Sequence, residues 1–374
     1  MQKKVLIIQQ IIPEYRLAFF KLLKAELEKS NITLDLIYGT GNNASEIKNA
    51  QALPWARQIA NKSLGFGKLK LIWQPLIKYL GHEDLIIVEK ANKLLLNYYI
   101  IVARKFWKNR LGFWGHGRNM QADAQSPGNR INRLILKKCD WWWAYTNSVK
   151  EFLVQHRYPP GRITVVQNSI DTHTLRMQLT EVDESEIILL KKQFGINGNY
   201  TAIFCGRMYS EKRLNFILET CYLVKAKIPE FHMILIGSGP DSELAEKAAA
   251  SHKWIHYLGT IIGRERVKYF KLASVQLMPG IVGLGILDSF ALETPIITTI
   301  HNQHSPEIEY LENGVNGMIT GNTLAEYSET VINTLKTNKY LDLIDGCILS
   351  AKEYTMEKMV ENFKNGIVSC LNDK

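Results

Sequence analysis

The feature that most constrains the fold is an alternation of short β-rich runs with longer helical stretches along all 374 residues. Residues 16–29, for example, repeat apolar side chains at helical spacing (Leu17, Phe20, Leu23 and Leu27) between two β-rich runs. Strands separated by such helices pair in parallel, so the pattern predicts a doubly wound α/β fold. The expected strands are residues 4–8, 32–38, 85–89, 111–114, 140–146, 163–167, 200–205, 232–236, 255–258, 275–278 and 295–299.

The chain is long enough for two domains of ordinary size. Residues 211–226 and 241–250 add two further helical patterns between predicted strands, whereas residues 171–192 contain no strand candidate and include the acidic run EVDESE. We therefore place the domain boundary near residue 185 and expect a cleft between the two domains. The predicted domains are 1–185 and 186–355, and residues 356–374 are expected to form a C-terminal helix that packs back toward the N-terminal domain.

Composition excludes several classes of protein. Apolar residues make up 46% of the chain and charged residues 22%, as in globular proteins. The most apolar run, residues 94–103, is about half of the roughly 20 residues that span a bilayer. The N-terminal apolar run continues into Pro13, Glu14 and Arg16 without a cleavage site, which favours a buried first strand over a signal peptide. Five scattered cysteines without CxxC spacing indicate a reduced, cytoplasmic protein without structural zinc.

The net charge of +10 belongs to the first half of the chain. Residues 1–185 hold 27 Lys+Arg and 15 Asp+Glu (+12), and the remainder holds 19 and 21 (−2), which together give +10. Nucleic acid, an anionic membrane face and an acidic substrate are the three partners that fit such a charge. Nucleic acid is the weakest, because no zinc-finger, RNP or helix-turn-helix signature accompanies it. A solvated basic surface without a partner remains an alternative.

Two basic, aromatic-rich segments favour the membrane among these partners. Residues 64–80 (LGFGKLKLIWQPLIKYL) and 98–110 (YYIIVARKFWKNR) place lysines and arginines beside Trp73, Phe106 and Trp107. This combination is typical of an interfacial helix on anionic lipid. Core helices also carry such aromatics, so both interpretations stay open. The membrane interpretation predicts a peripheral protein on the inner face of the membrane, with a lipid-linked acceptor.

The most informative motif is FCGRMYSEKR, in which a buried strand ends at Gly206. Arg207 and Lys212 follow around a turn into a helix. In open α/β sheets ligands bind at the carboxyl ends of strands, and helix-start N–H groups attract anions. Two surface bases are the alternative, but positive charge is unfavourable at a helix N-terminus. The motif therefore favours a diphosphate site.

Two glycine-rich turns follow other predicted strands. LIGSGPDSEL carries Gly237 and Gly239, which permit a tight turn and close backbone approach to a ligand. It lacks the complete G-x-G-x-x-G of a nicotinamide site. MPGIVGLGILDS joins a strand to a helix that carries Asp288, which could bind vicinal ribose hydroxyls or simply complement the helix dipole. The loop residues that could contact a phosphate or sugar are Gly280, Val282, Gly283, Leu284 and Gly285.

A histidine between two glycines is the main candidate in the first half. His116 follows a predicted strand in FWGHGRN, where it could hydrogen-bond a sugar or a developing oxyanion. A structural histidine is the alternative. Arg118 could assist with charge. His301 and His304 form a possible metal pair without a nearby third ligand, so no metal site is predicted.

These motifs resemble, in order and spacing, the family 4 glycosyltransferases of the GT-B fold. The resemblance rests on Gly206-Arg207 with Lys212, IGSGP, the glycine loop with Asp288, and TPIITT followed by SPE. It covers most of residues 200–320 and extends weakly to WGHG, YTNSVKEFL and VVQNSID. It implies two Rossmann-like domains, an N-terminal one for the acceptor and a C-terminal one for a nucleotide-sugar donor. The implied activity is a retaining hexosyltransferase reaction, with Arg207 and Lys212 on the diphosphate and Asp288 on the ribose.

The resemblance also implies partners and first-domain residues. The implied acceptor is a saccharide or lipid-linked saccharide in cell-envelope polysaccharide assembly, with no nucleic acid involved. No cofactor and no essential metal are expected, and no D-x-D occurs in the chain. In similar enzymes a histidine at the place of His116 touches the donor sugar. Glu14, Tyr15 and Arg16 lie where the family has a substrate-facing loop, although the usual paired glycines are absent.

Two departures from the family pattern leave alternatives open. Gly280 stands where the family has the first of two glutamates, and Asp288 stands at the second. Arg213 stands where the family prefers glycine and could contact phosphate or face solvent. A sugar-nucleotide epimerase on the same fold and a catalytically inactive GT-B scaffold are therefore alternatives to a transferase.

Overall fold

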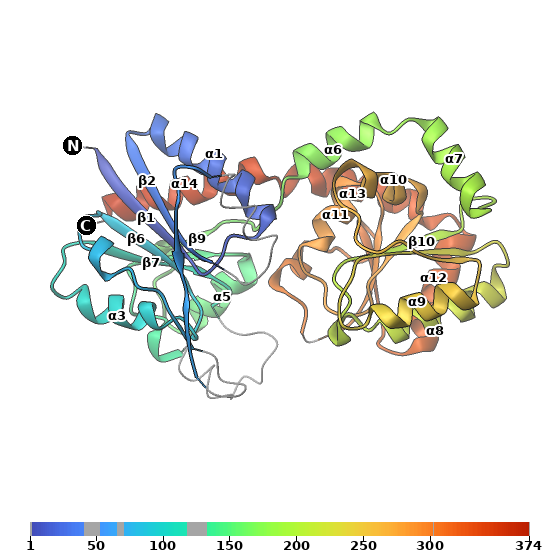
Figure 1. Cartoon of the computed structure of the whole chain (residues 1–374), viewed down its shortest axis with the longest axis horizontal. Helices are drawn as coiled ribbons and strands as arrows, with labels where there is room; N and C mark the ends of the chain where they lie inside the picture. Colours follow the sequence, from blue (N-terminus) through green and yellow to red (C-terminus); the bar gives the residue numbers. More distant parts are fainter. Residues whose placement is uncertain (1, 41–52, 66–70, 118–132, 302, 374) are drawn as a thin grey trace. The chain divides into compact units, whose positions relative to one another are not determined.

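The computed structural model describes residues 2–40, 53–65, 71–117, 133–301 and 303–373. The chain divides into two compact units (Figure 1). Unit 1 comprises Met1–Asp171 and Met356–Lys374, and unit 2 comprises Thr172–Thr355. Each unit is an α/β structure around its own parallel sheet, in agreement with the predicted fold class.

Unit 1 is built on a seven-stranded parallel sheet in the order β3-β2-β1-β6-β7-β8-β9. From β1 the chain adds strands on one side and then, from β6 onward, on the other. The strand order therefore reverses between β1 and β6, which is where open α/β sheets bind ligands. The strands are β1 (Lys3–Gln9), β2 (Ile32–Thr40), β3 (Arg57–Ala60), β6 (Leu85–Glu89), β7 (Arg110–Gly115), β8 (Trp141–Ala144) and β9 (Ile163–Val165).

The helices of unit 1 connect these strands. They are η1 (Glu14–Arg16), α1 (Leu17–Lys29), η2 (Ile77–Tyr79), α3 (Leu95–Ala103), α5 (Asn147–Gln155) and η3 (Pro160–Arg162). A two-stranded antiparallel sheet joins β4 (Lys62–Leu64) to β5 (Leu71–Trp73). The interfacial helix predicted for residues 64–80 is therefore wrong, because its described residues form a strand and a short 3-10 turn. The segment 98–110 contains the second half of α3 and the start of β7.

The C-terminal helix α14 (Met356–Asn372) belongs to unit 1 and lies beside α1 (Figure 1). Its Phe363 ring packs at 4.9 Å from the Trp114 ring and at 5.5 Å from the Trp143 ring. The Trp143 indole donates a hydrogen bond to the Phe363 carbonyl at 3.1 Å. Gly366 is needed for this approach, because a Cβ there would lie 2.6 Å from the Trp143 nitrogen. The last residues of the chain thus complete the core of unit 1.

Unit 2 repeats the same topology with six parallel strands in the order β12-β11-β10-β13-β14-β15. Its strand order reverses between β10 and β13, so this is the ligand-binding end that the topology predicts. β10 and β11 are buried along their whole length. The strands are β10 (Thr201–Cys205), β11 (His232–Ile236), β12 (Ile255–Tyr257), β13 (Val275–Leu277), β14 (Ile296–Thr299) and β15 (Gly317–Thr320).

The helices of unit 2 begin before the predicted domain boundary at residue 185. Glu186, in the first turn of α7, is bound by Arg264 of α10, and α6 packs on α10 and α11. Residues 172–185 therefore lie in unit 2, so the unit boundary precedes the predicted one. The helices are α6 (Thr172–Glu181), α7 (Glu184–Phe194), η4 (Ser210–Lys212), α8 (Leu214–Lys227), α9 (Ser242–Ser251), α10 (Gly263–Leu272), α11 (Gly285–Ala291), η5 (Pro306–Tyr310), α12 (Leu324–Lys336) and α13 (Lys339–Glu353).

All the predicted strands are present, with ends that shift by one or two residues. The strands β3, β4, β5 and β15 were not predicted. β3 and β4 are short and largely exposed, so their sequences lack the apolar run of a buried strand. No helix among the described residues is long and apolar enough to cross a membrane.

Candidate functional site

The ends of β10 and β11 are held together through glycines. Gly206 donates a backbone hydrogen bond to Ile236 at 3.0 Å, and Met208 donates one to Ser238 at 2.9 Å. A Cβ on Gly237 would lie 1.8 Å from the Gly206 carbonyl oxygen. Gly237 and Gly206 also have φ values of 134° and 156°, which side-chain-bearing residues rarely adopt. The structure therefore confirms the predicted tight turns at Gly206 and Gly237. These turns bring the FCGRMYSEKR and LIGSGPDSEL motifs into backbone contact.

Gly239 makes the next close approach in the same place. A Cβ there would lie 2.1 Å from the Met208 carbonyl oxygen, and φ is 156°. The Gly239 amide donates to the Ser242 hydroxyl at 2.7 Å, and the Asp241 amide donates to Met208 at 3.2 Å. The second motif is thus joined to the first at two successive positions.

The turn that carries Lys212 contacts the glycine loop after β13. A Cβ on Gly280 would lie 2.2 Å from the Glu211 carbonyl oxygen, and the Ile281 amide donates to that oxygen at 3.0 Å. The Lys212 ammonium donates to the Ile281 carbonyl. Burial lowers the Lys212 pKa from 10.5 to about 8, so this ammonium loses solvation that an anion could restore.

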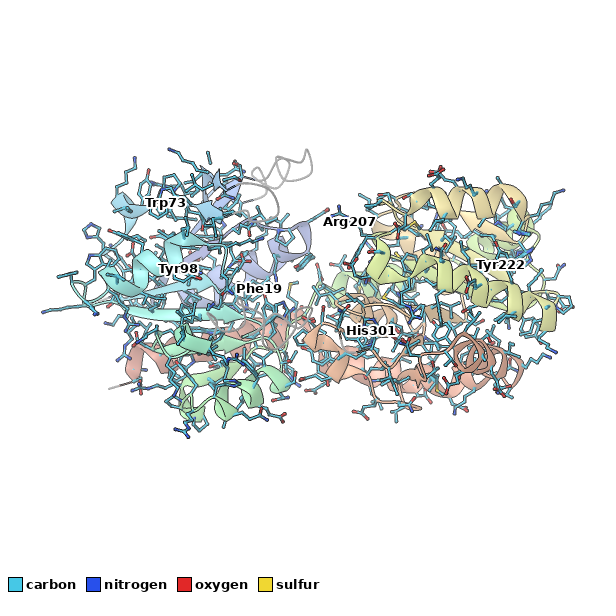
Figure 2. The ribbon with its side chains drawn as sticks, turned by 90° about the horizontal axis from the view of Figure 1, so that it is seen from below. Phe19, Trp73, Tyr98, Arg207, Tyr222 and His301 are labelled. Carbon is cyan, nitrogen blue, oxygen red and sulfur yellow. The ribbon has the colours of Figure 1, made fainter. Side chains whose placement is uncertain are left out.

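Arg207 lies on the loop after β10 and its side chain is exposed (Figure 2). It forms no hydrogen bond or ion pair with any other residue that the structure describes. Lys212 on the same turn is held by the protein, whereas Arg207 is available to a ligand. The chain thus places two cations after β10. Lys212 is fixed by a hydrogen bond, and Arg207 is bound by none of the described residues.

The loop 280–285 is fixed in place by residues that follow β14. The Val282 amide donates to Nδ1 of His304 at 3.0 Å, and Nε2 of His304 donates to the Thr299 carbonyl at 2.9 Å. The Ser305 amide donates to the Val282 carbonyl at 2.9 Å. Burial lowers the His304 pKa, which fits this neutral tautomer. The amides of Gly283, Leu284 and Gly285 donate to none of the described residues.

His304, for which the sequence predicts no metal site together with His301, is used within the protein. Both ring nitrogens of His304 are engaged by backbone groups of Val282 and Thr299. In the described part of the chain no group of three or more potential metal-ligand side chains occurs. Sequence spacing identified His304 but not its function, which is to position the glycine loop.

Asp288 is buried on α11 and forms a two-point ion pair. Nη2 of Arg266 lies 2.8 Å from Oδ1 of Asp288, and Nη1 lies 3.1 Å from Oδ2. The carboxylate raises the pKa of Arg266 above its ordinary value. Burial raises the pKa of Cys205, the last residue of β10, and the positive charge of Arg266 opposes that rise. Sequence analysis missed Arg266 because it lies on α10, outside every glycine motif.

Arg213 neither faces solvent nor remains free for a phosphate. Its guanidinium donates to the Pro279 carbonyl at 3.2 Å and to the Asn322 side chain, and it lies 4.0 Å from the centre of the Phe216 ring. Its φ of 58° is the left-handed conformation. This backbone conformation explains why glycine is preferred at the equivalent position in the family that the sequence resembles.

In unit 1 the His116 side chain is exposed at the end of β7. Its ring packs edge-on against the ring of Tyr145, with centroids 4.4 Å apart. The flanking glycines have φ values of 150° for Gly115 and 68° for Gly117. His116 therefore lies in a loop at the end of a strand, as the sequence predicted. Its chemical role stays a prediction.

Arg16 does not face a substrate, because it is only 4% exposed. Its guanidinium donates to the Asn168 side chain and lies 5.0 Å from the Trp114 ring and 5.7 Å from the Tyr145 ring. Arg16 therefore supports the ring against which His116 packs. Its neighbours Glu14 and Tyr15 are exposed on η1, and Arg118 lies outside the described residues.

Two charged residues that sequence analysis missed lie at the strand-order reversal of unit 1. The Gln10 amide donates to Oε2 of Glu89 at 3.1 Å, and burial raises the pKa of that carboxyl group. The Lys90 ammonium donates to the Asn92 side chain at 3.1 Å, and burial lowers its pKa to about 8. Glu89 ends β6 and Lys90 follows it, and the sequence of this strand carries no glycine motif to signal a site.

The structure thus joins the predicted residues of unit 2 into one site at the carboxyl ends of β10, β11 and β13. The glycines bring backbone groups together, Lys212 and Arg207 supply positive charge, and the loop 280–285 supplies unengaged amides. Such an arrangement suits a ligand with phosphate groups. Asp288 lies in the same unit with its carboxylate held by Arg266.

Comparison with known proteins agrees with this chemistry. Residues 199–337 match the family model of glycosyl transferases group 1. Alpha-monoglucosyldiacylglycerol synthase of Acholeplasma laidlawii is 24% identical over 199 residues, which are 51% of this chain and 49% of that protein. This chain therefore matches only about half the length of that relative. An uncharacterized glycosyltransferase of Haemophilus influenzae is 23% identical over 303 residues, 78% of each chain.

Solved structures extend the likeness to the whole fold. Anabaena Alr3699/HepE in complex with UDP aligns with a TM-score of 0.73 at 14% identity, covering 98% of this chain and 100% of that one. This likeness supports the fold alone, whereas the match of residues 199–337 is a match of sequence. The protein has the GT-B fold, and residues 199–337 are similar in sequence to glycosyl transferases group 1.

Proposed function

We propose that unit 2 binds a nucleoside-diphosphate sugar and that the protein transfers the sugar to a hydroxyl group with retention of configuration, as a family 4 enzyme. The observation that carries the proposal is the joining of Gly206, Lys212 and the loop 280–285 at the strand-order reversal of unit 2. HepE, a structural neighbour, has been solved with UDP and with UDP-glucose, which supports UDP as the first nucleotide to test.

In this proposal side-chain cations neutralise the diphosphate without an essential metal. When the bond between the sugar and the diphosphate breaks, negative charge develops on the leaving oxygen. Arg207 is exposed and unengaged by described residues, and Lys212 is a partly buried ammonium with a lowered pKa. Both would gain by contact with that charge, and the leaving oxygen would accept the acceptor's proton on the same face of the sugar. His116 would hydrogen-bond the sugar.

We propose a saccharide or lipid-linked saccharide of the cell envelope as the acceptor, bound by unit 1. Unit 1 holds 29 Lys+Arg and 15 Asp+Glu (+14), and unit 2 holds 17 and 21 (−4). A basic unit suits an acidic acceptor or the inner face of an anionic membrane. The product named in the Acholeplasma relative, a monoglucosyldiacylglycerol, supports a lipid acceptor.

The membrane part of the proposal rests on the end of α3. Phe106 is 86% exposed and Val102 is 61% exposed, and Lys105 and Lys108 are exposed near them. We expect the protein to float with vesicles that contain 30% phosphatidylglycerol, and Phe106→Ser to weaken this binding. Leu349→Ser, an exposed apolar residue of unit 2, is the control. Wild-type protein that remains unbound would remove the membrane from the proposal.

A transfer assay tests the reaction. The purified protein is incubated with labelled UDP-glucose, UDP-galactose or UDP-GlcNAc, with saccharide and membrane-lipid acceptors, in the presence and absence of EDTA. We expect an EDTA-resistant glycoside whose anomeric configuration, measured by NMR, equals that of the donor. Arg207→Ala should lower UDP affinity roughly tenfold or more. Formation of an altered sugar nucleotide without acceptor would instead indicate an epimerase, and absence of UDP binding would indicate a scaffold.

A further inference from the structure

Val282 is held at both of its backbone groups by two consecutive residues. Nδ1 of His304 accepts a hydrogen bond from the Val282 amide at 3.0 Å, and the Ser305 amide donates to the Val282 carbonyl at 2.9 Å. Val282 and His304 are both buried. Residues 283–285, which follow, supply the amides on which the proposed diphosphate site depends. Val282 therefore fixes the direction in which the chain enters this part of the loop.

The loop has little of its own to fix those amides. Gly283 and Gly285 lack a Cβ, so their backbones have more accessible conformations than those of other residues. A Cβ on Gly283 would lie 3.3 Å from Oγ of Ser305, so the chain passes close to the segment after β14. A loop of this composition keeps one conformation only where neighbouring segments hold it.

The two hydrogen bonds of His304 require a single protonation state. The Val282 amide can only donate, so Nδ1 carries a lone pair, and the Thr299 carbonyl can only accept, so Nε2 carries the proton at 2.9 Å from it. A cationic ring would instead direct an N–H group at the Val282 N–H group. Burial lowers the pKa of His304, which keeps the ring neutral. The ring is therefore a specific acceptor for Val282 and does more than fill space.

We propose that His304 is a positioning residue for the donor: its Nδ1 lone pair holds the Val282 amide and thereby orients the amides of residues 283–285 toward the diphosphate. This inference rests on the nucleotide site proposed above and adds a residue that does not touch the ligand. Without the bond the buried Val282 amide would lack a partner, and the loop would move to satisfy it. Only molecules with the loop in place would then bind, so the apparent affinity falls with their fraction.

Two variants separate the bond to Val282 from the bond to Thr299. In His304→Asn the side-chain oxygen stands where Nδ1 stands and can accept from Val282, but the donor to Thr299 is lost. In His304→Gln the side-chain nitrogen reaches the position of Nε2 and can donate to Thr299, but the acceptor for Val282 is lost. Each variant loses one hydrogen bond, so their melting temperatures should agree within about 3 °C.

The affinity for UDP, measured by isothermal titration calorimetry, should distinguish the two variants. We expect His304→Asn to bind within about threefold of wild type and His304→Gln to bind about tenfold more weakly or worse. His301→Gln is the matched control, because His301 lies on the same connection and accepts from the Gln303 amide at 3.2 Å. It makes no hydrogen bond to the loop 280–285 among the residues that the structure describes, and its UDP affinity should stay within about twofold of wild type.

Hydrogen–deuterium exchange tests the positioning without any ligand. The peptide that contains residues 280–285 should exchange faster in His304→Gln than in wild type, and at the wild-type rate in His304→Asn. If neither variant folds, nitrogen-15 NMR of wild-type protein keeps the inference testable, since it requires a neutral His304 with its proton on Nε2.

Four results would overturn the inference. They are equal UDP affinities in the two His304 variants, a loss of affinity that only follows the melting temperature, unchanged exchange in His304→Gln, and a proton on Nδ1 in wild type. Failure of wild type to bind UDP would overturn the proposed function itself, whatever the exchange rates.

Discussion

The two units share a strand order but differ at the ends of their strands. In unit 2 the ends of β10, β11 and β13 are joined by glycines, with backbone atoms at distances that no side chain allows. In unit 1 the corresponding edge is built from side chains, with His116 on Tyr145 and Tyr145 near the buried Arg16. The same topology therefore supports strand ends joined through the backbone and strand ends covered by side chains.

This difference suits the two units to different kinds of ligand. Backbone amides and two cations suit a phosphate group, which is common to all nucleotide sugars. Aromatic rings and polar side chains suit a ligand whose hydroxyls vary from one substrate to another. We therefore expect substitutions in unit 2 to affect nucleotide binding and substitutions in unit 1 to affect transfer.

The largest effect should come from Gly237→Ala. The added Cβ would lie 1.8 Å from the Gly206 carbonyl oxygen at a φ of 134°, so steric overlap and backbone strain add. We expect the free energy of unfolding, measured by urea denaturation, to fall by about 3–5 kcal/mol. The control is Gly161→Ala in unit 1, where nothing lies within 4 Å, with an expected change below about 1 kcal/mol. Equal stability of the two variants would refute the contrast between the units.

Lys212→Met should lower UDP affinity about 10- to 100-fold without a comparable loss of stability. The ammonium pKa is lowered to about 8, so its charge is present below pH 8 and is lost as the pH rises through that value. Wild-type affinity, measured by calorimetry, should therefore fall between pH 8 and 9.5. Lys212→Arg should flatten this dependence, and Lys247→Met, on the exposed face of α9, should retain it. A pH-independent affinity in wild type would exclude Lys212 from the site.

His116→Ala should leave the UDP dissociation constant within about twofold of wild type and lower the transfer rate about tenfold. The reason is that His116 belongs to unit 1, whereas the nucleotide groups proposed above belong to unit 2. The measurement pairs calorimetry with initial transfer rates, and His82→Ala, an exposed histidine of unit 1, serves as control. A large loss of UDP affinity in His116→Ala would contradict the expectation that unit 2 alone binds the nucleotide and unit 1 affects transfer.

The same contrast determines how much the sequence could predict. The sequence could predict the candidate site in unit 2 because glycines and charged residues follow directly after apolar strands. Local spacing alone therefore identified Gly206, Lys212 and Gly280. Arg266 and His304 act across the fold, and no local spacing relates them to Asp288 or Val282. Such contacts depend on tertiary packing and therefore appear only in the structure.

In unit 1 the sequence predicted the sheet but not the function of its strand ends. Arg16 was expected to face a substrate because it follows the first strand, yet helix η1 turns it into a cluster of aromatic rings. Glu89 was missed because a glutamate at the end of an apolar strand is indistinguishable from a solvated one. Only burial and the hydrogen bond from Gln10 distinguish it.

The smallest effect should come from Arg213, which occupies a glycine position of the similar family. Its left-handed backbone, with φ of 58°, costs about 1 kcal/mol for a residue with a Cβ. Its contacts with Pro279, Asn322 and Phe216 offset this cost. Arg213→Gly loses the contacts and the strain together, so its free energy of unfolding should change by less than about 1 kcal/mol. Arg213→Ala keeps the strain and should be about 1 kcal/mol less stable than Arg213→Gly. Both variants should bind UDP within about twofold of wild type, and a tenfold loss in both would place Arg213 among the phosphate-binding groups after all.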